Sequence, residues 1–152
     1  MNKFTGFLSV LFLFLVGCTN QQTIQTDETK EIIKTIKTQY EDIKEIKFAM
    51  YARQISIDVH WGDIPSNEEV LGSFELLKQF ISSETFEGKI INDVFFTEYD
   101  EKEAGYPEIF IYYDFNDDDE TDQSFTSSNE SDYMKWLYTK DYSNRGDTVI
   151  ME

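Results

Sequence analysis

Two adjacent runs of alternating apolar and polar residues constrain the fold of this 152-residue chain most strongly. The apolar positions are Ile46, Phe48 and Met50 in the first run, and Ile55, Ile57, Val59 and Trp61 in the second. Successive side chains of a strand point to opposite faces of a sheet, so a period of two indicates a half-buried strand. A short segment around Ala52 and Arg53 separates the runs. The pattern therefore predicts two strands joined by a tight turn.

Amphipathic helices are predicted on both sides of this hairpin. Between Asp27 and Tyr40, apolar residues recur at three- and four-residue spacing, and Asp27 is the predicted N-cap. After the hairpin, Ser66 and Glu69 have the spacing of a capping box, in which each side chain accepts a hydrogen bond from a free backbone N–H group. The apolar face that follows predicts a second helix and comprises Val70, Phe74, Leu77 and Ile81.

The second half of the chain predicts two more strands, at 89–99 and 108–115. The order helix, strand, strand, helix, strand, strand indicates an α+β fold of two αββ units. A four-stranded antiparallel sheet with both helices on one face is the simplest way to bury the apolar stripes.

The fourth predicted strand carries large apolar residues on both faces, because Phe110 and Tyr112 alternate with equally apolar neighbours. A second cover is therefore expected on this strand. We predict a C-terminal helix to supply it, in which Tyr133, Trp136 and Leu137 share one face.

The N-terminus has the order of a signal peptide. A basic residue, Lys3, precedes an apolar segment at 7–16, which is followed by Gly17 and Cys18. The apolar segment is about half of the ~20 residues that a helix needs to cross a bilayer, so a membrane span is the weaker interpretation. Residues Leu15-Val16-Gly17-Cys18 resemble the lipobox of bacterial lipoproteins.

The resemblance to bacterial lipoproteins covers residues 1–18 and implies neither a fold nor an activity for the rest. It implies that the signal peptide is removed and that the thiol of Cys18 carries a lipid with fatty acyl chains such as palmitate. The chain has one Cys, so no disulfide can form within it. We expect a protein anchored to the cell membrane through lipid on Cys18, on the extracytoplasmic face.

Charge restricts the partners of the mature chain. Residues 1–17 hold one Lys and no acidic residue, so their removal changes the formal net charge from −17 to −18. Nucleic acid repels such a chain and is not an expected partner. A hydrophobic fraction of 40% still predicts a folded domain. The predicted division is signal peptide at 1–17, lipidated N-terminus and tether at 18–26, one α+β domain at 27–142 and C-terminal tail at 143–152.

An acidic run after the fourth predicted strand is the nearest approach to a metal motif. In an EF-hand alignment that begins at Asp114, oxygen ligands fall at Asp114, Asn116, Asp118 and Asp122. The alignment places Asp119 where a glycine is needed and Phe125 where a bidentate glutamate is needed. The run is a candidate for weak Ca²⁺ binding, and a solvated acidic turn is the competing interpretation.

Catalytic patterns are weak throughout the sequence. His60 shares a strand face with Ser56 and Asp58, but Asp58 lies between them, whereas a hydrolase triad needs the histidine in the middle. One His and one Cys do not make a zinc site, and no glycine-rich phosphate loop occurs. We expect no enzymatic activity and no cofactor; a cell-envelope enzyme that uses carboxylates is an alternative, since the chain has 30 Asp and Glu.

Aromatic residues crowd the third and fourth predicted strands. Core packing accounts for them if the C-terminal segment covers the sheet; without that cover they form an exposed platform for a peptide or a sugar. The expected function is therefore a membrane-anchored, non-enzymatic protein-interaction module that engages an envelope protein through its sheet or its acidic rim. Weak calcium binding through residues 114–122 is a second alternative.

Overall fold

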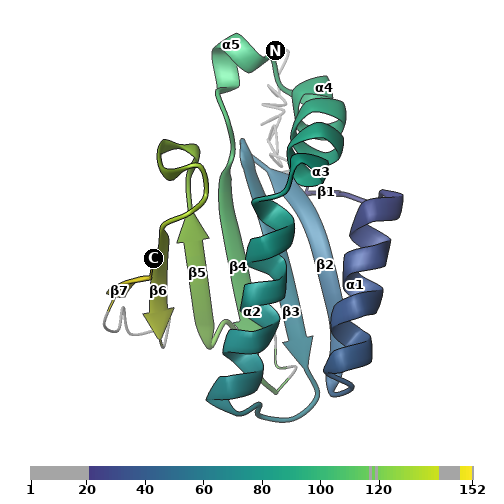
Figure 1. The fold of residues 1–152 in the computed structure, drawn as a ribbon, viewed down its shortest axis with the longest axis vertical. Helices are drawn as coiled ribbons and strands as arrows, with labels where there is room; N and C mark the ends of the chain where they lie inside the picture. Colours follow the sequence, from purple (N-terminus) through teal and green to yellow (C-terminus); the bar gives the residue numbers. More distant parts are fainter. Residues whose placement is uncertain (1–20, 117, 119, 141–147, 152) are drawn as a thin grey trace, which may run out of the picture.

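The computed structural model describes residues 21–116, 118, 120–140 and 148–151. In this part of the chain the fold is α+β, as predicted, with one mixed sheet (Figure 1). The strands lie side by side in chain order: β1 (Gln22–Thr23), β2 (Ile43–Tyr51), β3 (Gln54–Trp61), β4 (Glu108–Asp114), β5 (Gln123–Ser127), β6 (Trp136–Lys140) and β7 (Thr148–Met151). Neighbouring strands are antiparallel except β3 and β4, which are parallel. The predicted four-stranded antiparallel sheet is thus corrected to a larger mixed sheet.

Two long helices lie on one face of this sheet, as predicted (Figure 1). They are α1 (Asp27–Gln39) and α2 (Asn67–Ile81). The capping box of α2 is confirmed: the backbone N–H of Glu69 donates to Ser66 Oγ, and that of Ser66 donates to Glu69 Oε2. The N-cap of α1 is Thr26 instead of Asp27, since its side chain accepts from the N–H of Thr29.

The hairpin of β2 and β3 is confirmed, with Tyr51 opposite Gln54. Its two turn residues, Ala52 and Arg53, have φ angles of 48° and 71°. Two consecutive left-handed residues match the right-handed twist of the flanking strands and make the tight turn possible.

The predicted strand at 89–99 is wrong, because this segment is helical. It comprises α3 (Glu84–Phe86), a π-helix η1 (Glu87–Phe95) and α4 (Phe96–Glu98), followed by α5 (Glu101–Ala104). The buried residues recur at steps of four, one and four residues, at Phe86, Ile90, Ile91 and Phe95. This spacing fits a helix face, although the run of large apolar residues resembles a buried strand. The long helical crossover is what allows β4 to lie parallel to β3.

The predicted C-terminal helix is also wrong. The segment forms β5, a short 3₁₀ turn η2 (Asn129–Ser131) and β6. Asp132 and Tyr133 have φ angles of 49° and 57°, which a right-handed helix cannot contain. Trp136 is buried whereas Leu137 is 46% exposed, as expected of neighbours on a strand.

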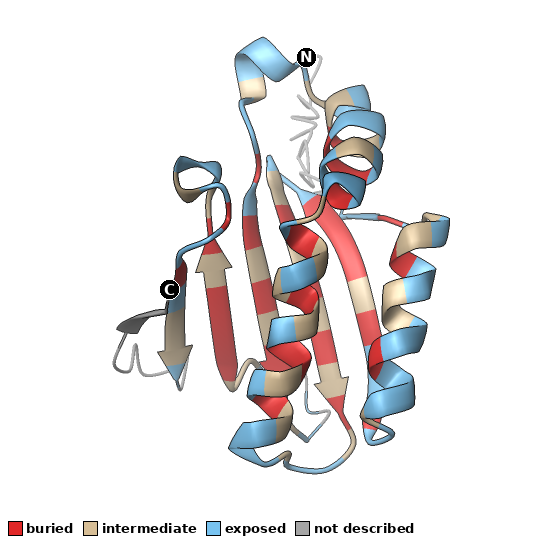
Figure 2. Cartoon of the chain, in the orientation of Figure 1, coloured by how far each residue is buried: buried red, intermediate tan, exposed pale blue. Residues whose placement is uncertain are grey.

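The core lies between the sheet and the helices (Figure 2). At its centre the ring of Phe74 from α2 stacks on Phe125 of β5, with centroids 4.0 Å apart, and meets Trp136 of β6 edge to face at 5.2 Å. On the side of β2, Phe80 contacts both Phe48 and Phe86, which joins the helical crossover to the same core. The described helices therefore pack on one face of the sheet and do not cover the other.

Segments predicted to be tether and tail contribute strands. Residues 22–23 pair with β2, and Ile24 is 3% exposed. Residues 148–151 pair with β6. Residues 1–17 and Cys18 lie outside the described residues. Within the described ranges, the structure contains no helix with the length and apolar character needed to cross a membrane.

Candidate functional site

The face of the sheet opposite α1 and α2, which we call the open face, carries the second set of side chains from each strand. Along β3, the residues on the core face are fully buried, whereas Ser56 and Asp58 are only half-buried. On the neighbouring strand β4, Phe110 pairs with Ser56 and Tyr112 pairs with Asp58. Parallel pairing therefore places one aromatic ring beside each of these polar side chains.

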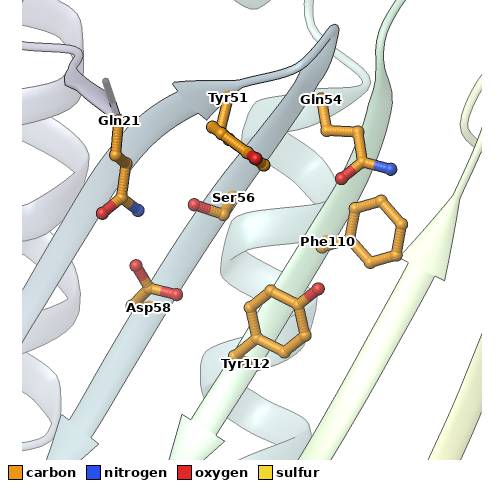
Figure 3. A pocket seen from close by; sticks show the side chains of 7 residues that line it. All are labelled: Gln21, Tyr51, Gln54, Ser56, Asp58, Phe110 and Tyr112. Carbon is orange, nitrogen blue, oxygen red and sulfur yellow. The ribbon is translucent and has the colours of Figure 1, made fainter. Parts of the chain in front are cut away.

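These side chains surround a shallow depression, the open-face hollow, of about 450 Å³ (Figure 3). Its lining residues are Gln21, Tyr51, Gln54, Ser56, Asp58, Phe110 and Tyr112. Figure 3 views the sheet from the hollow side, with the helices behind the strands. The hollow is thus built on rigid strands β2, β3 and β4, with one contribution from the segment before β1.

Aromatic rings form the floor and one wall of the hollow. The rings of Phe110 and Tyr112 are nearly parallel, with an interplanar angle of 11° and centroids 5.8 Å apart. Both rings show their faces to the viewer in Figure 3, whereas the ring of Tyr51 is seen edge-on. Tyr51 is 41% exposed. The arrangement offers an apolar surface with a flat floor to a ligand.

Two polar side chains of the hollow, Ser56 and Asp58, make no hydrogen bond within the described residues. The hydroxyl oxygen of Ser56 is buried and makes no hydrogen bond there. Nor is any hydrogen bond or ion pair found for the carboxylate of Asp58 in the described ranges. Burial raises the pKa of Asp58, which the nearby charges of His60 and Lys47 oppose and that of Glu45 reinforces. A half-buried carboxylate without a hydrogen-bond donor is costly to keep charged, which marks this position as a candidate binding site.

His60 takes no part in a triad with Ser56. Its Nδ1 atom lies 3.1 Å from Oδ2 of Asp114, the residue that pairs with it across β3 and β4. In the sequence, Asp58 is the acidic residue nearest to His60 on the same strand face. The observed partner follows from parallel strand pairing, which the sequence did not predict.

The acidic loop between β4 and β5 contains the residues predicted as weak calcium ligands. Oδ1 of Asp114 accepts hydrogen bonds from the N–H groups of Asn116 and Asp118, at 3.2 and 3.3 Å. Oδ2 of Asp122 accepts from the N–H of Phe115 at 2.7 Å. The side-chain amide of Asn116 donates to Asp118. These bonds are those of a hydrogen-bonded turn, and the described part of the chain contains no group of three or more His, Cys, Asp or Glu side chains placed to hold a metal ion.

The structure therefore brings together residues that the sequence treated separately. Phe110 and Tyr112 were singled out for their apolar character, while Asp58 appeared only in a rejected triad. Gln21 and Tyr51 had no signal of their own. The predicted lipidation site, Cys18, lies outside the described residues. Comparisons with protein-family models, with curated proteins and with solved structures found no match to this chain.

Proposed function

We propose that this protein is a lipid-anchored, extracytoplasmic binding module without enzymatic activity, which engages an envelope protein through the open face of its sheet. The observation that carries this proposal is the open-face hollow, where aromatic rings adjoin the carboxylate of Asp58 and the buried hydroxyl of Ser56, which has no partner in the described residues. Lipid anchoring is supported by Leu15-Val16-Gly17-Cys18, and a partner that is itself on the envelope would meet the open face there.

The chemistry of the hollow favours binding over catalysis. Asp58 is the one carboxylate among its lining residues. A glycosidase-type mechanism needs a pair of carboxylates on either side of the scissile bond. His60, whose Nδ1 atom contacts Asp114, is not among the described residues that line the hollow. The internal hydrogen bonds of residues 114–122 likewise favour a structural turn over calcium binding.

Site-directed photo-cross-linking tests the proposed surface. A photoreactive phenylalanine analogue at position 110, in the full chain in its native cells, is expected to give a discrete covalent adduct with another protein. The same analogue at Glu75, which is exposed on α2 on the opposite face of the domain, is the matched control and should give none. Equal adducts from both positions, or none from position 110, would contradict the proposal.

The predicted anchor has its own test. Cys18→Ala is expected to move the protein out of the membrane fraction, because a diacyl anchor supplies stable attachment. An unprocessed Cys18→Ala chain that stays in the membrane fraction would show that the apolar segment at 7–16 holds it there without lipid.

A further inference from the structure

We infer that the open-face hollow binds the cationic side chain of a lysine or arginine in a basic segment of the partner protein. The inference rests on the proposed function and names the chemistry by which the partner is recognised. It is carried by the position of the Asp58 carboxylate next to an aromatic floor, on a chain with a formal net charge of −17.

The basic side chains near Asp58 make their hydrogen bonds to other residues, although their charges act to lower its pKa. Lys47 lies opposite Asp58 in the register of β2 and β3, yet its ammonium is 3.4 Å from the side-chain oxygen of Gln21. His60 is hydrogen-bonded to Asp114. Glu45, on the same face, adds a further negative charge. Asp58 therefore keeps a carboxylate that an external cation can reach on the side of β4.

An apolar surface lies beside that carboxylate. The ring of Phe110 faces outward, and its cross-strand neighbour is Ser56, two residues before Asp58. A lysine or arginine side chain could lay its aliphatic stem and its charge over this ring, because aromatic faces attract cations. Tyr51 would border the same stem from β2.

The hollow also contains hydrogen-bond acceptors. An ammonium or guanidinium group carries several N–H donors and no acceptor. The buried hydroxyl of Ser56 has no partner in the described residues. Gln54 donates through Nε2 to Glu108, and Figure 3 shows its amide oxygen turned toward the hollow. The hollow thus offers two further oxygen acceptors along β3, on the same face of the sheet as the carboxylate of Asp58.

An uncharged ligand fits this site less well. A sugar or a neutral peptide could cover Phe110, but it would further desolvate the carboxylate of Asp58 without neutralising it. A cation turns the same desolvation into a stronger attraction, since the ion pair then forms in a partly water-excluded site. Charge complementarity therefore favours a basic segment over a sugar or a neutral peptide as the ligand of this aromatic surface.

Binding of a defined peptide tests the inference. The probe is Gly-Lys-Gly-Lys-Gly-Lys, titrated into the full chain in a nonionic maltoside detergent, because a choline detergent would itself present a quaternary ammonium. Calorimetry gives the Kd, and backbone amide shifts locate the site. We expect shifts at Ser56 and Asp58, and no binding of the same peptide with acetylated lysines. Nα-acetyl-lysine amide, which keeps its side-chain ammonium, is expected to bind much more weakly than the peptide.

Two variants of the hollow and a charge-matched control distinguish binding at this site from general electrostatic attraction between the cationic peptide and the acidic chain. Asp58→Asn should weaken peptide binding roughly tenfold because it removes the partner charge, and Phe110→Leu about threefold because it removes the ring face. Glu31→Gln, an exposed site on α1, removes one charge far from the hollow and should change Kd less than about twofold. Equal effects of Asp58→Asn and Glu31→Gln would overturn the inference, as would tight binding of the acetylated peptide or of Nα-acetyl-lysine amide.

The same variant distinguishes this inference from the proposed function. Cross-linking from position 110 is repeated with Asp58→Asn present, and a marked loss of the adduct is expected. An undiminished adduct would overturn recognition of a cation while the protein-binding function stands. Absence of an adduct from the wild-type open face would overturn the proposed function itself.

Discussion

The two faces of β3 differ although they belong to the same eight residues. On the core face, Ile55, Ile57, Val59 and Trp61 are at most 1% exposed. On the open face, Gln54, Ser56, Asp58 and His60 are half-buried and polar. The core face meets α1 and α2, whereas the open face contributes to a hollow. One strand can therefore supply stability through one set of side chains and a binding surface through the other.

The largest expected effect tests the core face. Phe74→Ala removes a ring that stacks on Phe125 and contacts Trp136, so it should lower the free energy of unfolding by about 3–5 kcal/mol. Urea denaturation measures the change. Phe110→Ala, which removes the same number of atoms from the open face, is the control and should cost no more than about 1.5 kcal/mol. Equal costs would end the distinction between the two faces.

Asp114 is expected to be an exception to this difference between the two faces, because it is an open-face residue that stabilises the fold. It lies on the open face at the end of β4, but it is 5% exposed and accepts hydrogen bonds from two backbone N–H groups. Asp114→Ala leaves those donors and His60 without this acceptor, so we expect a loss of about 1–3 kcal/mol in the free energy of unfolding. The exposed Asp63→Ala is the control and should change stability little.

The same loop also answers the calcium question. Thermal melting of the wild type with and without millimolar Ca²⁺ should show no shift, because the carboxylates are engaged by backbone N–H groups. A rise of several degrees that disappears in Asp118→Asn would instead identify residues 114–122 as a ligand site.

The N-terminal cap of α2 is expected to contribute to stability on the core face, because it holds the helix that covers that face. Ser66→Ala removes the acceptor for the N–H of Glu69 and should cost about 1 kcal/mol. Asn67→Ala, one residue later, makes no capping bond and is the control. If both variants melt alike, the cap contributes nothing to holding α2 over the core.

Signals contained within a few residues were predictable from the sequence. The capping box at Ser66 and Glu69 and the turn at Ala52 and Arg53 are of this kind. Features that depend on distant pairing were not. The contact of His60 with Asp114 exists only because β3 and β4 are parallel, and that follows from the helical segment at 84–98.

The two wrong elements have local physical reasons. The apolar run near Ile90 and Ile91 satisfies a buried strand and a buried helix equally well in the sequence, since periodicity alone cannot separate them. Near the C-terminus, the left-handed residues Asp132 and Tyr133 end any helix. Asp adopts this conformation more readily than most residues, but Tyr rarely does, so the pair does not indicate it in the sequence. The open-face hollow has a non-local cause instead: the sequence raises an exposed aromatic platform, but only strand pairing places Ser56 and Asp58 beside Phe110 and Tyr112.

The smallest expected effect concerns Asp58 and has an informative sign. Burial raises its pKa above the ordinary value of 3.8, so this carboxyl holds its proton more tightly in the folded protein than in the unfolded chain. The charged carboxylate therefore destabilises the fold above the raised pKa, and this penalty disappears as the pH falls below 3.8. Asp58→Asn should melt slightly higher than wild type at pH 7, and the two melting curves should converge near pH 3.

Glu69→Gln is the sign-reversed control for that experiment. Hydrogen bonds from Ser66 lower the pKa of Glu69, so its charge stabilises the fold above the ordinary value of 4.5 and the benefit is lost at lower pH. The Gln variant should therefore melt lower than wild type at pH 7. A fall in the melting temperature of Asp58→Asn would mean that this carboxylate has a structural partner. A rise, together with lost peptide binding, would mean that the open face keeps a charge that the fold itself does not favour, as binding sites commonly do.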